Sequence, residues 1–367
     1  MKNISIMIKP ASSLCNLRCE YCFYEDVSSK RTASSCGIMR QETVNKIIDN
    51  VFSCMNEKDR VSFVFQGGEP TLAGLPFFLH FTEEVEKKKG SVLVSYAIQT
   101  NGILLDESWC KFFKRNNFLV GISLDLLPEI HDRYRKDTNG NGTYERVNAA
   151  RKVLESYGVE YNILSVLTDD LAKEPEKVWD YLCREDIGYT QFIPCLGKIE
   201  GEKKSCRLNP CSFAGFYSHL FFLWAKAFKA GKYRSIKLFD DLINLLAYGR
   251  QTACGITGRC HPQLVVEADG RVFPCDFYAL DEYCIGNLAC ENVEDIYNRA
   301  AKSSFIMRDS ADADVCIGCP YLRICHGGCL RMRKEVCGFD GENECGYRLF
   351  LDNCLPELQQ IIHSILN

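Results

Sequence analysis

The sequence predicts an α/β protein, in which an open, partial (β/α)6 TIM-like barrel is followed by a cysteine-rich extension. Six short apolar strands alternate with segments of helical period, which is the pattern of a parallel sheet with right-handed crossovers. Six strand–helix units are too few to close a barrel of eight. Beyond Cys254 this alternation stops, and a hairpin signal at Asp269-Gly270 and a cysteine-dense region replace it.

The individual elements follow from the spacing of the apolar residues. The expected strands cover residues 4–9, 61–65, 92–98, 118–124, 159–167 and 189–194. The expected helices cover residues 40–57, 75–89, 106–116, 143–157, 174–186, 211–230, 238–248 and 346–366. Two short strands joined by a tight turn are expected within residues 264–273. The polar segment 197–209 is typical of a boundary loop. We expect a barrel domain at residues 1–235 and the extension with its terminal helix at residues 236–367.

Composition narrows the class of protein. The 367 residues are 46% hydrophobic and carry a net charge of −4, which does not favour a nucleic-acid partner. No apolar stretch is long enough for a membrane span, and the N-terminal apolar run is too short for a signal peptide. The 22 cysteines are unusual for so long a chain, since disulfide scaffolds are usually short. We therefore expect a cytoplasmic metal-binding protein from an anaerobic or strongly reducing host.

One group of three cysteines lies near the start, in the sequence Cys15-Asn-Leu-Arg-Cys19-Glu-Tyr-Cys22. A [4Fe–4S] cluster needs four ligands, so three thiolates from one loop leave one iron open to bind a small molecule. This spacing therefore predicts a reaction centre rather than an electron relay. The alternatives are three buried apolar cysteines or part of a zinc site, although zinc ligands usually occur in C-x2-C pairs.

Polar and glycine-rich segments follow several strands, at the edge where barrel enzymes gather their functional groups. Gly67-Gly68-Glu69-Pro70 ends the second strand, and its glycines allow a backbone to approach a ligand closely. Gln99-Thr-Asn101-Gly102 ends the third strand, and Ser123 ends the fourth. Each of the first two segments is also explained by an ordinary turn, so the two explanations stay open.

A second set of cysteines lies in the extension. Its members are Cys254, Cys260, Cys275, Cys316, Cys319, Cys325, Cys329 and Cys345. Eight thiolates are the number that two fully ligated [4Fe–4S] clusters require. Two zinc sites are the alternative, because C-x2-C-x5-C also occurs in zinc proteins. Cys345 is the least certain of the eight, since Cys337 and Cys354 flank it.

The first cysteine group resembles the signature of the radical S-adenosylmethionine (SAM) enzymes. The resemblance implies that the open iron binds SAM and that the reduced cluster cleaves it to methionine and a 5′-deoxyadenosyl radical. It also implies the partial-barrel fold. The residues that the resemblance assigns to SAM binding are Tyr21, Gly67, Gly68, Glu69, Ser123, Arg135 and Leu196.

The extension resembles the SPASM domain of radical SAM proteins, and the resemblance divides its cysteines between two auxiliary clusters. It assigns to the nearer cluster Cys254, Cys260, Cys275 and Cys329. It assigns to the farther cluster Cys316, Cys319, Cys325 and Cys345. Three [4Fe–4S] clusters and SAM are therefore the expected cofactors.

Within that superfamily, the chain resembles the anaerobic sulfatase-maturating enzymes over nearly its whole length. The matching stretches are Ile8–Cys15, Cys22-Phe-Tyr24, Gly37–Arg40, Phe65–Gly74, Gln99–Gly102, Pro274–Tyr278 and Gly327–Cys329. The resemblance implies oxidation of a Cys or Ser side chain of a sulfatase to Cα-formylglycine without oxygen. It implies an unfolded or nascent sulfatase as substrate and a flavodoxin or ferredoxin as electron donor.

The same resemblance assigns roles in the reaction. The substrate Cβ must lose a hydrogen atom, then an electron and a proton, to become an aldehyde or thioaldehyde. Asp276 matches the base that takes the proton, and Tyr24 and Gln66 match residues that orient the peptide. One departure from the family is that Leu126-Leu127-Pro128 stands where a glycine usually follows Asp125, which leaves the position of Arg135 uncertain.

Two other functions stay open at this point. One is a SPASM-type enzyme that forms thioether or other crosslinks in a ribosomal peptide natural product. Such enzymes often carry a leader-binding domain, whereas only 14 residues precede Cys15. The other is a non-catalytic metal-binding protein.

Overall fold

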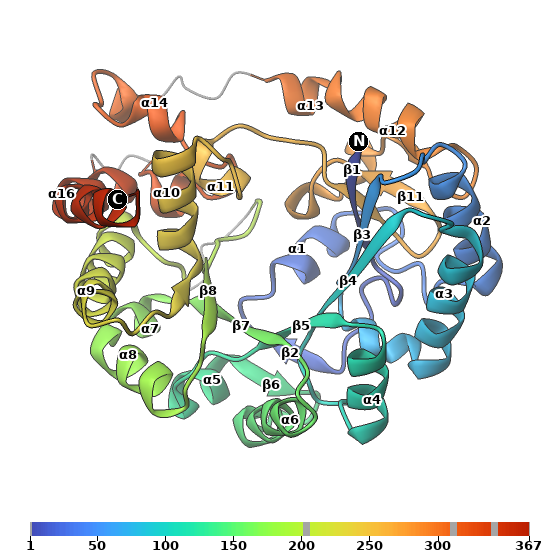
Figure 1. The fold of residues 1–367 in the computed structure, drawn as a ribbon, viewed down its shortest axis with the longest axis horizontal. Helices are drawn as coiled ribbons and strands as arrows, with labels where there is room; N and C mark the ends of the chain where they lie inside the picture. Colours follow the sequence, from blue (N-terminus) through green and yellow to red (C-terminus); the bar gives the residue numbers. More distant parts are fainter. Residues whose placement is uncertain (1, 201–205, 309–313, 339–343, 367) are drawn as a thin grey trace. The chain divides into compact units, whose positions relative to one another are not determined.

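The computed structural model describes residues 2–200, 206–308, 314–338 and 344–366 (Figure 1). The chain divides into two compact units. The first comprises Met1–Ser123, Arg135–Tyr161 and His261–Arg308. The second comprises Leu124–Tyr134, Asn162–Cys260 and Asp309–Asn367. No helix in the described part of the chain is long and apolar enough to cross a membrane.

A largely parallel sheet forms the centre of the first unit. Its parallel strands are, in spatial order, β10 (Leu264–Val266), β1 (Asn3–Ile8), β3 (Arg60–Phe65), β4 (Leu93–Thr100) and β5 (Phe118–Ser123). Two antiparallel strands continue the sheet beyond β10, namely β11 (Arg271–Phe273) and β12 (Gly286–Asn287). In β3, Val61, Phe63 and Phe65 are buried while the residues between them are half-buried, which is the period of two expected for a strand.

The first unit contains seven α-helices in the part of the chain that the structure describes. They are α1 (Phe23–Ser29), α2 (Gln41–Phe52), α3 (Leu75–Lys88), α4 (Glu107–Arg115), α6 (Tyr144–Ser156), α12 (Val293–Ala301) and α13 (Ser304–Met307). The short 3₁₀ helices are η1 (Pro70–Ala73), η2 (Asp276–Tyr278) and η3 (Asp281–Tyr283). In Figure 1, α2, α3 and α4 lie along the outer side of β3, β4 and β5. Asp106 begins α4 by accepting hydrogen bonds from the backbone N–H groups of Ser108 and Trp109.

A small antiparallel ribbon adds to the first unit. Strand β2 (Leu17–Cys19) lies within the first cysteine group, and β6 (Arg135–Asp137) pairs with it. The register places Cys19 opposite Arg135. Two residues that are far apart in the sequence are thereby brought to the same point.

The second unit combines three strands with the remaining helices. Its strands β7 (Tyr161–Leu167), β8 (Tyr189–Pro194) and β9 (Ser235–Ile236) are parallel. Its helices are α5 (Pro128–Tyr134), α7 (Asp169–Ala172), α8 (Pro175–Arg184), α9 (Pro210–Lys229), α10 (Lys237–Tyr248), α11 (Cys254–Thr257), η4 (Asp314–Cys316), α14 (Leu322–Cys325), α15 (Arg333–Val336) and α16 (Gly346–Leu366). Asn209 begins α9 by accepting a hydrogen bond from the N–H of Ser212, and Pro210 fills the first helical position.

The six predicted strands, the hairpin and the eight predicted helices are all present, with small changes at their ends. The helix predicted for residues 40–57 ends at Phe52. A tight turn follows, in which Asp59 accepts a hydrogen bond from the Asn56 N–H and Lys58 adopts φ 67°. Sequence analysis did not predict α1, α5 or the β2–β6 ribbon. The domain boundary at residue 235 stays a prediction.

Candidate active site

The first cysteine group connects β1 to α1. The Cys22 thiol stands at the start of α1 and accepts a hydrogen bond from the Glu25 N–H at 3.4 Å. The Cys15 thiol accepts one from the Leu17 N–H, also at 3.4 Å. Burial raises the pKa of Cys15 to about 11, although the Leu17 hydrogen bond opposes that change. Three partly exposed thiols, two of which accept a backbone N–H, are a donor set that fits three corners of a [4Fe–4S] cluster.

The turn after β3 is bonded directly to this cysteine loop. The N–H of Gly68 donates to the Ser12 carbonyl and that of Glu69 to the Leu14 carbonyl, both at 2.8 Å. A Cβ atom on Gly68 would lie 2.1 Å from the Leu14 carbonyl oxygen, so only glycine fits there. The turn is thus held against the loop that would carry the cluster.

The Glu69 side chain has a structural task in this turn. Its buried carboxylate accepts hydrogen bonds from the Thr71 N–H and hydroxyl, the Thr100 hydroxyl and the Asn101 N–H, at 2.6–3.0 Å. Burial raises the pKa of Glu69, and these four bonds act in the opposite direction. Since both carboxylate oxygens are engaged, Glu69 ties the end of β3 to the end of β4. A direct bond from Glu69 to SAM stays a prediction.

The segment after β4 contacts the cysteine loop. The Asn101 side-chain amide donates to the Asn16 side chain at 2.8 Å and lies 3.9 Å from the Cys15 sulfur. Gln99 donates to the Ser123 hydroxyl at 3.0 Å, which brings the ends of β4 and β5 together. Sequence analysis left this segment open between a turn and a functional element, and a functional role stays a prediction.

The other residues predicted to bind SAM fall into two groups. Arg135 is buried, and its guanidinium carbon lies 5.3 Å from the centre of the Tyr21 ring, beside Cys19 in the β2–β6 ribbon. These residues belong to the first unit, as do the glycine turn and Ser123. Leu196 is buried after β8 in the second unit.

Asp276 lies in a compact polar group in the first unit. Its Oδ1 is 2.5 Å from the Nζ of Lys9, and its Oδ2 accepts a hydrogen bond from the Gln66 side chain at 3.0 Å. The Lys9 side chain is 1% exposed and that of Asp276 is 10% exposed. The Lys9 ammonium and the Gln66 amide thus each engage one carboxylate oxygen of Asp276, and a carboxylate held in one orientation can serve as a general base. The structure therefore brings together two predicted residues and adds Lys9.

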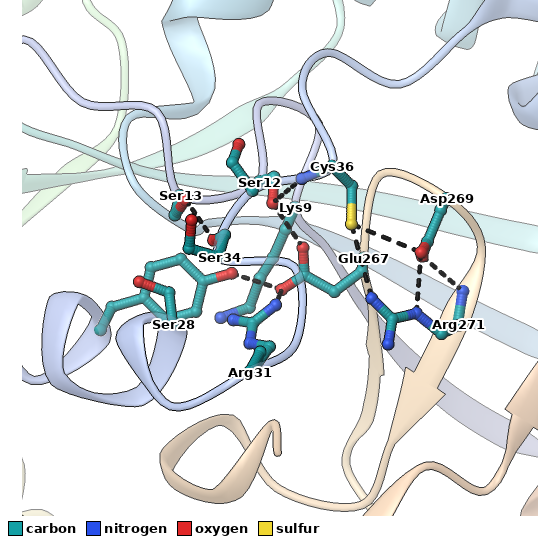
Figure 2. A network of polar contacts seen from close by, with 12 residues as sticks. Lys9, Ser12, Ser13, Ser28, Arg31, Ser34, Cys36, Glu267, Asp269 and Arg271 are labelled. Atoms are coloured by element: carbon teal, nitrogen blue, oxygen red, sulfur yellow. Dashed lines mark hydrogen bonds and ion pairs between the residues drawn. The ribbon is translucent and has the colours of Figure 1, made fainter. Parts of the chain in front are cut away.

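A second polar group adjoins the first (Figure 2). The Tyr24 hydroxyl donates to Glu267, whose carboxylate also pairs with Arg31 at 2.8 Å and accepts from the Ser12 hydroxyl at 2.9 Å. The Nζ of Lys9 lies 3.3 Å from the centre of the Tyr24 ring and so joins the two groups. Burial acts to raise the pKa of Glu267, but the charges of Lys9 and Arg31 and the hydroxyl hydrogen bonds hold it below its usual range.

Sequence analysis missed four members of these groups, namely Lys9, Ser12, Arg31 and Glu267. Weak signals existed for two of them. Lys9 ends an apolar strand immediately before the cysteine loop, and Glu267 interrupts the apolar run Leu264-Val-Val. A charge in a buried strand is expensive unless it is paired, so both positions pointed to partners elsewhere. Nothing in the sequence indicated which partners these are.

The cysteines of the extension that lie in the second unit form two sets. Burial raises the pKa of Cys254 to about 11, with further increases from Cys329 and Cys260. Burial also raises the pKa of Cys325 to about 11, and Cys345, Cys316 and Cys319 add to this increase. Each set is therefore close enough for its thiols to influence one another. Cys275 belongs to the first unit, where it follows β11.

The neighbourhood of Cys345 bears on the least certain ligand. A hydrogen bond from the Cys337 thiol lowers the pKa of Cys345 to about 6. The same bond and burial raise the pKa of Cys337. Cys354 is fully buried in α16, and burial raises its pKa to about 11. The choice of Cys345 over Cys337 and Cys354 as the last ligand stays a prediction.

Comparison with known proteins identifies the family. The profile of the radical SAM superfamily matches residues 10–179, and that of the SPASM iron–sulfur cluster-binding domain matches residues 258–320. The cysteine-type anaerobic sulfatase-maturating enzyme of Clostridium novyi is 41% identical over 100% of this chain and 99% of its own length. The chain belongs to the anaerobic sulfatase-maturating enzymes.

Two more relatives agree with this membership. The solved structure of native anSMEcpe with bound AdoMet and the Cp18Cys peptide has a TM-score of 0.89 and 38% identity, with 99% of each chain covered. The serine-type anaerobic sulfatase-maturating enzyme of Bacteroides thetaiotaomicron is 28% identical over 100% of this chain and 93% of its own.

The membership of this family confirms the predictions of fold, enzyme class and cofactors. The fold is the radical SAM fold with a C-terminal SPASM domain, and the protein is a radical SAM oxidoreductase with [4Fe–4S] clusters and SAM as cofactors. The iron–sulfur match favours clusters over zinc in the extension. The roles of individual site residues stay predictions.

The departure from the family sequence after Asp125 has a visible consequence. Leu126 adopts φ 62° and is fully buried, although this left-handed conformation favours glycine. Hydrogen bonds hold the turn, because the Leu127 N–H donates to the Asp125 carbonyl at 2.7 Å and the Asp125 N–H donates to His131 Nδ1 at 3.2 Å. The chain therefore forms a glycine-type turn with a leucine, and α5 follows it directly.

Proposed function

We propose that this protein oxidises a cysteine side chain of a sulfatase to Cα-formylglycine without oxygen. The observation that carries the proposal is the Lys9–Asp276–Gln66 group, in which the carboxylate of Asp276, the residue after Cys275, contacts Lys9 after β1 and Gln66 after β3. The preference for cysteine over serine rests on the relatives, since those named cysteine-type are 39–41% identical and those named serine-type are 25–28% identical.

The side chains of the site account for the proton and for orientation. When bound, SAM and the clusters supply the radical that removes a hydrogen atom from the substrate Cβ and accept the electron that leaves next. Asp276 takes the proton that leaves with this electron. Lys9 contacts one oxygen of its carboxylate and Gln66 the other, and together they fix the orientation of the carboxylate. Water then replaces sulfur on the resulting thioaldehyde and releases hydrogen sulfide. Tyr24 and Gln66 are proposed to orient the peptide.

The binding sites for the cofactors are proposed as the sequence predicted them. SAM would contact Tyr21, Gly67, Gly68, Glu69, Ser123, Arg135 and Leu196. The substrate would be an unfolded or nascent sulfatase in the cytoplasm, with a flavodoxin or ferredoxin as electron donor. The cluster ligands would be Cys15, Cys19 and Cys22, with the eight cysteines of the extension as auxiliary ligands.

The test uses reconstituted holoenzyme under anaerobic conditions, with SAM, a reductant and two sulfatase peptides that differ only in Cys or Ser at the target. We expect about 12 irons per chain, four in each of three clusters. We also expect aldehyde from the Cys peptide at a rate at least about tenfold above that from the Ser peptide, a difference of about 1.4 kcal/mol in barrier. Cleavage of SAM without aldehyde from either peptide would refute the proposal. Faster conversion of the Ser peptide would refute the cysteine preference alone.

A further inference from the structure

The Glu267 carboxylate bonds residues on both sides of the Cys15–Cys22 loop. Before the loop, the Ser12 hydroxyl donates to its Oε2 at 2.9 Å. After the loop, its Oε1 accepts a hydrogen bond from the Tyr24 hydroxyl and pairs with the Arg31 guanidinium at 2.8 Å. Figure 2 shows Ser12 and Arg31 pointing to Glu267 from opposite sides. One side chain of the β10–β11 hairpin thus holds both flanks of the loop.

The surroundings of Glu267 indicate more than packing. The side chains of Glu267 and Arg31 are both 0% exposed, and two charges buried this deeply lose their hydration. A well-packed apolar pair at such a position is often at least as stable, so retained charges favour a task in orientation. Ser12 supports this conclusion, because it adopts φ 49° and its hydroxyl both donates to Glu267 and accepts the Cys36 N–H at 3.0 Å.

The group also connects to the proposed base. Glu267 fixes the Tyr24 hydroxyl, the Tyr24 ring lies 3.3 Å from the Lys9 ammonium, and Lys9 pairs with Asp276 at 2.5 Å. A shift of the Tyr24 ring would therefore move Lys9 and change the direction in which the Asp276 carboxylate points. These three contacts form one continuous path from the hairpin to the base.

We propose that Glu267 is a positioning residue, which holds both flanks of the cysteine loop and, through Tyr24 and Lys9, aims Asp276 at the substrate. Arg31 and Ser12 fix Glu267 in turn. Both Glu267 oxygens are engaged by the protein itself, so the residue acts through its neighbours. The part of this inference that concerns Asp276 rests on the proposed function. The part that concerns the fixing of α1 by Glu267 does not.

The test compares Glu267→Gln with a matched control, Glu155→Gln. Glu155 also accepts a hydrogen bond from a tyrosine hydroxyl, that of Tyr161, and pairs with the buried Arg151, but it lies on α6. In holoenzyme with full iron content, we expect E267Q to lower kcat for aldehyde at least about tenfold, with KM for the peptide within about twofold. It should also raise the amount of 5′-deoxyadenosine formed per aldehyde at least about threefold. E155Q should match the wild type in all three quantities.

A second readout does not depend on turnover. Hydrogen–deuterium exchange of the holoenzyme should be faster over α1 in E267Q and unchanged there in E155Q. If wild-type enzyme makes no aldehyde, the proposed function fails and the exchange result alone decides whether Glu267 clamps α1. If folded E267Q forms as much 5′-deoxyadenosine per aldehyde as the wild type and shows wild-type exchange over α1, the inference is overturned.

A conservative variant covers the case in which E267Q does not fold. Arg31→Lys keeps a positive charge beside Glu267 but removes the planar guanidinium, whose carbon lies 5.2 Å from the centre of the Tyr24 ring. We expect R31K to fold and to form an amount of 5′-deoxyadenosine per aldehyde that lies between those of the wild type and E267Q. If E267Q does not fold, R31K decides. A wild-type ratio of 5′-deoxyadenosine to aldehyde together with wild-type exchange over α1 overturns the inference, and altered values of both support it.

Discussion

Two glutamates in the described part of the chain have the same chemistry but different consequences. Glu267 and Glu155 each accept a hydrogen bond from a tyrosine hydroxyl and pair with a buried arginine. The Glu155 group is local, since its tyrosine is 6 residues away and its arginine 4. Glu267 reaches a tyrosine 243 residues away. The Glu155 side chain is 40% exposed and that of Glu267 is 0% exposed.

The comparison shows what separation along the chain changes. The Glu155 group follows from helical spacing, because residues four apart on α6 face one another, and water can replace a lost partner. The Glu267 group exists only when the hairpin, the cysteine loop and α1 have all been assembled. We infer that the Glu267 group positions residues of the active site, whereas the Glu155 group contributes modestly to the free energy of unfolding.

The largest effect is expected at Asp276, the proposed base, which Glu267 contacts through Tyr24 and Lys9. Asp276→Asn keeps the shape of the side chain but removes the base, so aldehyde formation should fall about 100-fold or more. SAM cleavage should continue, because the variant leaves the cysteine loop and glycine turn intact. Mass spectrometry of the peptide and chromatography of 5′-deoxyadenosine measure the two quantities. A variant that keeps more than about a tenth of the wild-type rate would exclude Asp276 as the base.

The next effect concerns stability. Glu267→Ala leaves the Arg31 charge buried without its partner, which should cost about 3–5 kcal/mol of the free energy of unfolding. Glu155→Ala removes a half-exposed partner and should cost about 1 kcal/mol or less. Anaerobic urea unfolding of the two holoenzyme variants gives both values. Equal losses would show that burial of the pair does not distinguish the two groups.

The smallest effect is a dependence on pH. The pKa of Glu267 is held below its usual range, so the folded protein binds fewer protons there than the unfolded chain does in acid. The stability that Glu267 contributes is fully present above about pH 4.3, the ordinary glutamate value, and is lost as the pH falls through the folded pKa. The difference in urea midpoint between wild type and E267Q should therefore be constant from about pH 7 to 5 and shrink below about pH 4.3. A difference that grows in acid would contradict the lowered pKa.

The sequence predicted the elements that depend on local pattern. Apolar period gave the strands β1, β3, β4, β5, β7 and β8, and the Asp269-Gly270 turn gave the hairpin. Cysteine spacing gave the loop at Cys15, because a cluster demands ligand types at short, fixed intervals. Asp276 came from resemblance to the family.

Residues whose role depends on distant contacts were beyond local pattern. Lys9, Arg31 and Glu267 are charged residues in ordinary-looking segments, and only the assembled sheet shows that they are buried and paired. Leu126 illustrates a different limit. The sequence showed that glycine was missing, but the φ of 62° that this leucine adopts required the structure.

The 243 residues between Tyr24 and Glu267 also set an order of events during synthesis. At about 5–20 residues per second, Glu267 is made about 12–50 s after Tyr24. Throughout that interval Cys15, Cys19 and Cys22 exist on the nascent chain without the carboxylate that later holds both flanks of their loop. During that interval the flanks of the loop lack the contacts of Ser12, Tyr24 and Arg31 with Glu267, so we expect the loop to become fixed only after the hairpin has been made.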